Sequence, residues 1–477
     1  MRPMSRRGGA EVIVASIGTE HASQSRLSWW PAGGFAGRLR ELFAGGSDSS
    51  VARRLAGAAF LIRVVSALVA FLSQIVLARW LGGYEFGIYV YAWTWVLLLG
   101  GMVDLGLGSA AQRFIPEYIE LQQFALLRGF LRGSRWLASL AATLIAATAA
   151  GLVWVLSSHI DTDDIVPLLI ACAALPIYGL SQVQSGVARS YGWVNLGLSP
   201  VYVFRQFLLL ALLALALAFG LAMNAVIATL TAVVALWGVT LGQSVVLGRR
   251  LAGKVAPGPR AYAVRSWLAT AAPIFVVEAF YLLLTYSDVI VLQQFRPPDE
   301  VAIYYAAAKS MALVAFIYFS VAQTLAHKFA EYHVAGDRRR LADFLVVAVR
   351  MTFWPSLASV LALLAFGRPL LWMFGHDFVS GYYLMFIIAV GLLARASVGP
   401  AERVLNMLGE RRSCALIYAG AFVMNLVLCF VLIPHFGIAG AALAGAGALV
   451  FESASLFIVA KVRLGLHCFV FGRPRIP

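Results

Sequence analysis

Nine ionisable side chains lie inside long apolar stretches of the sequence: Arg63, Asp104, Arg205, Glu278, Asp288, Lys309, Arg350, Arg395 and Glu452. On insertion scales a charged residue at the centre of a bilayer costs about 2.5–3.5 kcal/mol, so such residues need a compensating role. Arg350 and Arg395 are close to predicted helix ends, and we expect them either to extend toward the membrane surface as interface anchors or to face the interior of the bundle. Most of the others are predicted to face protein or a wet cavity.

Three of these residues are cations of the kind that binds phosphate. Arg offers a planar fork and Lys a compact charge, so Arg63, Arg205 and Lys309 are predicted to bind an anionic substrate. Glu278 and Asp288 are carboxylates that burial could allow to take up and release a proton, and they are candidates for ion coupling or for a gate. Structural ion pairing explains the same five residues equally well.

The composition indicates which elements position these residues. Of 477 residues, 61% are apolar and 12% are charged, whereas a soluble domain carries about 25% charged residues. This excludes a soluble or disordered chain and indicates a polytopic membrane protein. Spanning helices need about 20 mostly apolar residues, and open strands cannot span lipid. Twelve stretches qualify: 57–78, 87–106, 136–157, 166–186, 199–219, 225–247, 267–292, 303–325, 346–367, 383–399, 416–433 and 438–460.

The basic residues predict the orientation. With the N-terminus inside, 29 of the 37 lysines and arginines lie in the inner segments, and the outer loops hold only Arg79, Arg296 and Arg368. This asymmetry follows the positive-inside rule and places both termini in the cytoplasm. Most of the formal charge of +15 is thereby explained by topology and by attraction to anionic lipid, without nucleic acid.

An internal repeat divides the chain. Residues 75–92 match residues 290–307 at seven of eighteen positions, at an offset of 215, and a second block around Phe219 matches residues around Phe436 at an offset of 217. Six spans per repeat return the chain to the same side, so we expect two parallel six-helix repeats forming a two-lobed bundle with a central cavity. The predicted parts are a basic cytoplasmic segment 1–56, a first half 57–248, a linker 249–266, a second half 267–460 and a cytoplasmic tail 461–477.

The repeat register relates two of the buried charges. Adding 215 to Arg63 gives Glu278, so the first helix of each half carries a charge of opposite sign at the same position. We expect these two residues to form an inner gate across the axis that relates the halves. The alternative is that they are two unrelated charges in one wet cavity.

Two further segments have structural interpretations. Residues 113–130 are predicted to form a helix on the inner membrane surface, where Arg113, Arg128 and Arg132 suit anionic headgroups, and which either guides substrate entry or is a simple connector. The glycine run at 106–111 follows an apolar helix and is assigned to helix packing. No phosphate-binding loop, zinc motif or catalytic motif occurs, so we expect no cofactor, no metal and no enzymatic activity.

Two stretches resemble the polysaccharide flippase family of the multidrug/oligosaccharidyl-lipid/polysaccharide exporter superfamily: SQIVLARWLGGYEFGIYVYAWTWVLLLGGMVDLGLGSAAQRFIPEY and LIPHFGIAGAALAGAGALVFE. The segment from Asp288 to Tyr304 resembles the start of that family's second half. The resemblance covers residues 55–460 and implies a flippase that moves a polyprenyl-pyrophosphate-linked oligosaccharide from the inner to the outer leaflet of the bacterial inner membrane. A polysaccharide polymerase and a chain-length regulator are then expected partners. The alternatives are an ion-coupled drug or lipid II exporter of the same superfamily and an integral-membrane glycosyltransferase or polymerase.

Overall fold

The computed structural model describes residues 48–318, 321, 325, 329, 331–332 and 336–471, and of residues 48–64, 338 and 411 it describes the backbone alone. The chain divides into two compact units, Met1–Arg54 and Leu55–Pro477, and the account below concerns the second. The predicted segment 1–56 lies almost wholly outside the described residues, as does the end of the tail. The part of the chain that is described is helical and contains no β-strand.

The helices of the first half follow one another with short connections. They are α2 (Asp48–Gly100), α3 (Leu107–Glu120), α4 (Phe124–Val155), η1 (Ser157–His159), α5 (Thr162–Cys172), α6 (Leu175–Ser190), α7 (Val194–Ser199), η2 (Pro200–Phe204), α8 (Arg205–Ala218) and α9 (Ala225–Ala252). Helix α6 packs against α3, α4 and α9, α3 also packs against α4, and α8 lies along α9.

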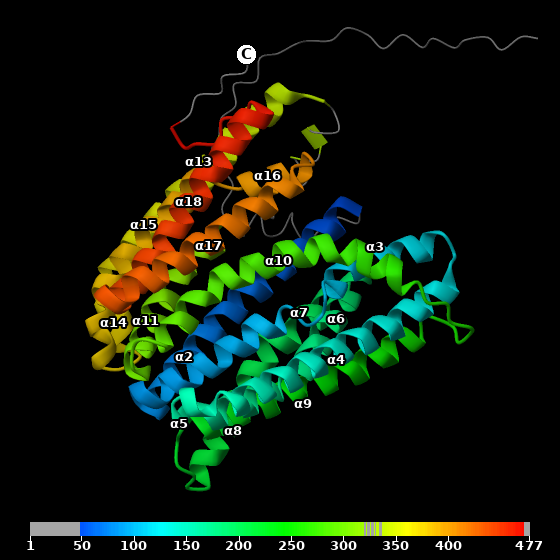
Figure 1. Cartoon of the computed structure of the whole chain (residues 1–477). Helices are drawn as coiled ribbons and strands as arrows, with labels where there is room; N and C mark the ends of the chain where they lie inside the picture. Colours follow the sequence, from blue (N-terminus) through cyan, green and yellow to red (C-terminus); the bar gives the residue numbers. More distant parts are fainter. Residues whose placement is uncertain are drawn as a thin grey trace, which may run out of the picture. The chain divides into compact units, whose positions relative to one another are not determined.

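The second half repeats this plan. Its elements are α10 (Val264–Gln293), α11 (Pro298–Met311), η3 (Ala312–Val314), α13 (Arg338–Ala365), α14 (Gly367–Trp372), η4 (Asp377–Gly381), α15 (Tyr382–Val398), α16 (Ala401–Met407), α17 (Arg411–Phe436) and α18 (Ile438–Leu464). Helix α18 packs against α15 and α17, and α15 packs against α13 (Figure 1). Figure 1 shows α10 between this group and the helices of the first half.

Twelve spans account for these helices. Ten described stretches are long and apolar enough to cross a membrane, and α5 with α6 forms a further one bent by 42°. One of the ten, Val65–Gly100, has 36 residues, which would extend about 54 Å and exceed the hydrocarbon core of about 30 Å. Its backbone leaves the helical region at Gly82, with φ 76° and ψ 172°, so α2 contains two spans. The prediction of a twelve-span, two-lobed all-α membrane protein is confirmed.

The repeat register agrees with the places where helices break. Gly82 plus 215 is Pro297, and Pro297 is the extended residue directly before the start of α11. A glycine with positive φ and a proline thus make the same break in the two halves, because neither residue favours a continuous helix.

Buried apolar side chains form one cluster at the predicted outer end and two at the predicted inner end. The outer cluster joins the halves: the ring of Phe86 in α2 lies 6.1 Å from that of Tyr305 in α11 and 6.2 Å from that of Phe378 in η4. One inner cluster belongs to the first half and the beginning of α10, where Trp267 lies 5.2 Å from Phe130. The other belongs to the second half. Helix α10 therefore packs with the first half at both ends, whereas among the described residues the helices from α11 onward share a core with the first half only at the predicted outer end.

Polar contacts close the same outer end. Arg79 in α2 donates to the carbonyl oxygens of Met373 and Trp372, each at 2.7 Å, and its guanidinium lies 5.0 Å from the Trp372 ring. Gln293 at the end of α10 donates to Asp164 of α5 at 3.1 Å. The acidic outer loop of the first half is thus tied to the second half.

Helices α3 and α6 are in close contact at two glycines. A Cβ added to Gly186 would lie 2.0 Å from the carbonyl oxygen of Gly108, so only glycine fits there. The carboxylate of Asp104 accepts hydrogen bonds from the backbone N–H groups of Gly106 and Gly108, each at 3.0 Å, and so supports the start of α3. This agrees with the assignment of the glycine run to packing.

The single surface helix predicted over 113–130 is wrong. Helix α3 ends at Glu120 and α4 begins at Phe124, with Gln122 between them at a φ of 55°. The polar residues in this turn interrupt the apolar pattern, and the second part of the segment begins the long spanning helix α4 instead.

Candidate functional site

A cavity of about 450 Å³ lies between the two halves. The first half lines it with both spans of α2 and with η2 and α8, and the second half lines it with α11 and η3. Its walls combine aromatic, amide and cationic groups, including Phe71, Gln74, Trp93, Tyr202, Arg205, Gln206, Tyr305, Lys309 and Phe316. Such a mixture of apolar walls and a few polar groups is typical of a ligand site.

Two of the predicted phosphate-binding residues meet in this cavity from opposite halves. Arg205 begins α8, directly after the π-helical turn Pro200–Phe204, and its guanidinium lies 5.1 Å from the centre of the Trp93 ring. Lys309 lies near the end of α11 with its ammonium 5.0 Å from the ring of Tyr305, one turn earlier in the same helix. The lining contains no Asp or Glu among the described residues. The cavity therefore offers positive charge to an anion.

The cavity also presents unused hydrogen-bonding atoms. The Nε of Arg205 is buried without a hydrogen-bond partner among the described residues, and the same holds for the side-chain carbonyl oxygens of Gln74 and Gln206. A buried polar group without a partner is costly, so these atoms are suited to a polar ligand. The two glutamines and Trp93 escaped the sequence analysis because neutral side chains in an apolar helix carry no charge signal.

The other predicted site residues are placed differently. Arg63 belongs to α2, but its side chain lies outside the described residues, so the proposed pairing with Glu278 stays a prediction. The described partner of Glu278 is Ser109 of α3, whose hydroxyl donates to it at 2.9 Å. Asp288 of α10 accepts a hydrogen bond from the hydroxyl of Tyr304 in α11 and another from the N–H of Val289 at 2.8 Å. Neither carboxylate is among the residues that line the cavity.

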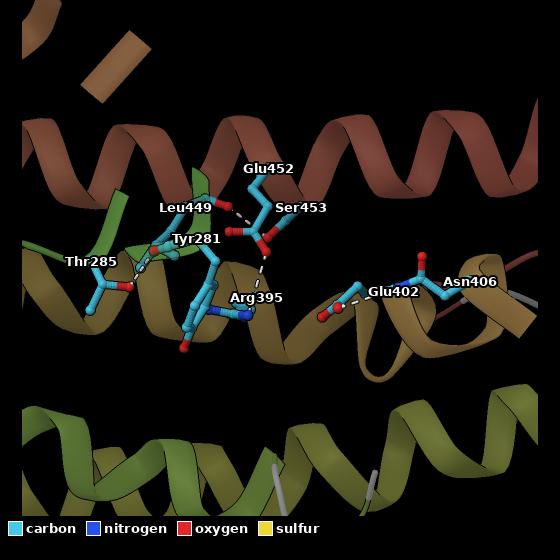
Figure 2. Close-up of polar contacts among 8 residues, drawn as sticks. All are labelled: Tyr281, Thr285, Arg395, Glu402, Asn406, Leu449, Glu452 and Ser453. Atoms are coloured by element: carbon cyan, nitrogen blue, oxygen red, sulfur yellow. Dashed lines mark hydrogen bonds and ion pairs between the residues drawn. The ribbon is translucent and has the colours of Figure 1, made fainter. Parts of the chain in front are cut away.

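A buried ion pair in the second half was not expected. Figure 2 shows Arg395 of α15 paired with Glu452 of α18. The two charged groups are 3.6 Å apart, and the Glu452 side chain is 1% exposed. The guanidinium also lies 6.0 Å from the ring of Tyr281 and 5.1 Å from that of Tyr318. The expectation that Arg395 extends to the membrane surface is wrong, because a carboxylate and two aromatic rings hold it inside the bundle. Arg350, by contrast, donates to the carbonyl of Val470 in the tail at 3.4 Å.

Comparison with known proteins identifies the family. Residues 54–330, more than half of the chain, match the family described as polysaccharide biosynthesis protein. The chain belongs to this family. The resemblance of its motifs to polysaccharide flippases is therefore confirmed. Among curated protein sequences no significant match was found.

Solved structures with the same fold are transporters and flippases. An inward-facing multidrug resistance MATE family transporter of the MOP superfamily is 14% identical over 90% of this chain and 97% of its own, with a TM-score of 0.67. The lipid II flippase MurJ in an inward closed conformation is 14% identical over 84% and 87%, with a TM-score of 0.65. A MOP superfamily transporter from Pyrococcus furiosus is 14% identical over 89% and 97%, with a TM-score of 0.64. At this identity the likeness shows the fold alone.

Proposed function

We propose that this family member is a flippase that moves a polyprenyl-pyrophosphate-linked oligosaccharide from the inner to the outer leaflet. The observation that carries the proposal is the pair of cations, Arg205 and Lys309, that the two halves contribute to one cavity without an acidic lining residue among those described. Both can bind the pyrophosphate, since charge-assisted hydrogen bonds to phosphate are strong in a site of low dielectric.

The neutral lining groups suit the sugars of such a substrate. The side-chain carbonyls of Gln74 and Gln206 can accept hydrogen bonds from sugar hydroxyls, and Tyr202 offers an exposed ring on which a sugar can stack. The lipid tail need not enter the cavity, because the surrounding bilayer solvates it.

We further propose that the halves 57–248 and 267–460 rock against each other in alternating access. The core that joins the helices from α11 onward to the first half at the predicted outer end, and the separate core of those helices at the predicted inner end, support a conformation closed toward the outside. Substrate would then enter from the cytoplasmic leaflet, and opening requires the contacts of Arg79 and Gln293 to separate.

Asp288 is the residue we propose for ion or proton coupling. Its partner Tyr304 belongs to the helix that presents Lys309 to the cavity, so a change of charge at Asp288 can be passed to α11. Asp288→Asn keeps an acceptor for the Tyr304 hydroxyl but removes the charge, and should uncouple flipping from an imposed ion gradient. Unchanged gradient dependence in this variant would exclude Asp288 from coupling.

A second candidate is a lipid II flippase, because the same two cations suit its pyrophosphate and MurJ has the same fold. A cationic drug is a poorer fit, since Arg205 and Lys309 would repel it. The polymerase, an expected partner, would join the flipped oligosaccharides. The chain-length regulator, the other expected partner, would set the length of the product.

The deciding experiment is deletion of the gene followed by analysis of lipid-linked intermediates. We expect the oligosaccharide to accumulate on its lipid carrier, inaccessible from outside spheroplasts, and expression of the wild-type chain to restore export. Arrested peptidoglycan synthesis would favour lipid II, and drug sensitivity with normal polysaccharide would favour a drug exporter. Loss of the lipid-linked intermediate itself would favour a glycosyltransferase.

A further inference from the structure

A second cavity, of about 440 Å³, has a basic lining and lies between α4 and the linker that precedes α10. We define it as the linker cleft. Helix α4 contributes Arg128, Arg132, Arg135 and Trp136, and the linker contributes Arg260 and a turn of small residues around Pro257. No residue lines both the linker cleft and the central cavity. It therefore needs an explanation of its own.

The linker is held firmly against α4, so the cleft is preformed. Arg128 donates to the carbonyls of Pro259 at 2.8 Å and Ala256 at 3.1 Å, and the N–H of Ala261 donates to the carbonyl of Ala125 at 2.9 Å. A Cβ added to Gly129 would lie 1.7 Å from the carbonyl oxygen of Ala261, which shows how closely the two segments approach.

The charges of the cleft are not balanced. Four arginines line it, and the described lining includes no Asp or Glu. Arg128 uses two of its donors on the linker, but Arg135 has its Nε and Nη2 buried without a hydrogen-bond partner in the described part of the chain. Because a guanidinium does not lose its proton in proteins, these donors require an acceptor. Phosphate oxygens match this arrangement in both charge and geometry.

The surroundings indicate that this phosphate belongs to a lipid. Trp136, at the mouth of the cleft, is 66% exposed, and Leu140 and Leu144, one and two turns further along α4, are 58% and 60% exposed. Residues four apart lie on one face of a helix, so this apolar stripe leads from the cleft into the predicted membrane. A soluble anion makes no use of such a stripe, whereas an acyl chain covers it.

We infer that the linker cleft binds the headgroup of an anionic phospholipid of the cytoplasmic leaflet, with an acyl chain along Leu140 and Leu144. The predicted orientation places the cleft at the inner membrane surface, where anionic lipids attract clustered arginines. The bound lipid would fix the linker between the two halves while they move. This inference does not depend on the substrate of the central cavity.

The test is lipid retention by the full-length protein, measured by native mass spectrometry after purification with phosphatidylglycerol or phosphatidylcholine. We expect selective retention of phosphatidylglycerol, and about tenfold weaker retention in Arg135→Gln, in line with the loss of about 1.4 kcal/mol. Arg132→Gln is a milder second variant, because Arg132 is exposed and less able to disturb folding. Arg265→Gln is the matched control, since Arg265 is exposed at the start of α10 and does not line the cleft.

Three outcomes would overturn the inference. One is equal retention of the two lipids by the wild-type protein. Another is equal loss of phosphatidylglycerol in the control and in the cleft variants. The third is full displacement of the lipid by millimolar inorganic phosphate, which would identify a site for a soluble anion. Circular dichroism and gel filtration of each variant ensure that weaker retention is not a consequence of misfolding.

Discussion

Gln293, the last residue of α10, donates a hydrogen bond at 3.1 Å to Asp164 in the first turn of α5 and so joins the two halves of the bundle. Arg79 makes a similar connection to the carbonyls of Trp372 and Met373. Both contacts lie at the predicted outer end, beside the apolar core in which α2 packs against α11. The inner gate expected from Arg63 and Glu278 would act at the opposite end. The outer contacts and the inner gate would then open in turn.

Removing the Arg79 contacts should favour opening at the outer end. In an Arg79→Ala variant we expect a cysteine placed at Ala70, which lines the central cavity, to react about tenfold faster with a membrane-impermeant maleimide added outside, equivalent to about 1.4 kcal/mol. The native cysteines are first replaced. Arg368→Ala is the control, because this arginine stacks on Tyr382 at the same end without joining the halves. Equal labelling rates in the two variants would contradict the outer closure.

The two cavity cations should be needed for flipping and not for folding. We expect Arg205→Gln to slow transport in proteoliposomes at least tenfold, as about 1.5–3 kcal/mol of lost charged hydrogen bonding predicts. Arg205→Lys should retain part of the rate, since it keeps the charge and loses the fork. Arg368→Gln is again the control. If Arg205→Gln and Lys309→Gln both transport normally, the cavity does not bind the substrate in the way proposed.

The pair formed by Arg395 and Glu452 should be visible in stability. Removing one partner leaves a buried charge uncompensated, and such changes cost about 3–5 kcal/mol. We therefore expect Glu452→Ala to lower the melting temperature in detergent by several degrees. The double change Arg395→Met with Glu452→Met should recover most of this loss, because no unpaired charge remains. A double variant as unstable as Glu452→Ala would assign the effect to packing.

The spans were predictable because a long apolar stretch indicates a helix that is removed from water. The repeat was predictable because identical residues recur at one offset, as Gly82 and Pro297 confirm by breaking the helices at equivalent positions. Both the hydropathy and the repeat are patterns in the order of residues along the chain. They sufficed for the number of helices and for the presence of Arg205 and Lys309 in the bundle.

The partners of the buried charges were not predictable in the same way. Hydropathy places Arg395 near a helix end but does not tell which side of α15 it occupies. No pattern in the sequence therefore predicted its contact with Glu452 of α18. The glutamines of the cavity are neutral and so left no trace in the charge pattern. The repeat register relates Glu278 to Arg63, and their pairing stays a prediction, but no pattern in the sequence indicated the described contact of Glu278 with Ser109 of α3.

The close approach of α3 and α6 should make Gly186 sensitive to substitution. A Cβ at this position would lie 2.0 Å from the carbonyl oxygen of Gly108, so we expect Gly186→Ala to destabilise the protein by about 1–3 kcal/mol. Gly151→Ala in α4 is the matched control, because its Cβ would meet no atom within 4 Å. That change should leave stability unchanged or raise it by up to about 1 kcal/mol through helix propensity. Equal unfolding midpoints in the two variants would rule out the contact.

The topology follows from the basic residues and can be tested at both sides of the membrane. Twelve spans return the chain to its starting side, and α18 carries Lys461 and Arg463 in its last turn. We therefore expect alkaline phosphatase fused after residue 477 to be inactive, and a green fluorescent protein at the same place to fluoresce. Phosphatase fused after Asp161 should be active, since the segment between α4 and α5 carries no Lys or Arg, and Asp161 is followed by Asp163 and Asp164 in the first turn of α5. Phosphatase activity at the C-terminal fusion would require an odd number of spans or the opposite orientation. It would also place the linker cleft at the outer surface.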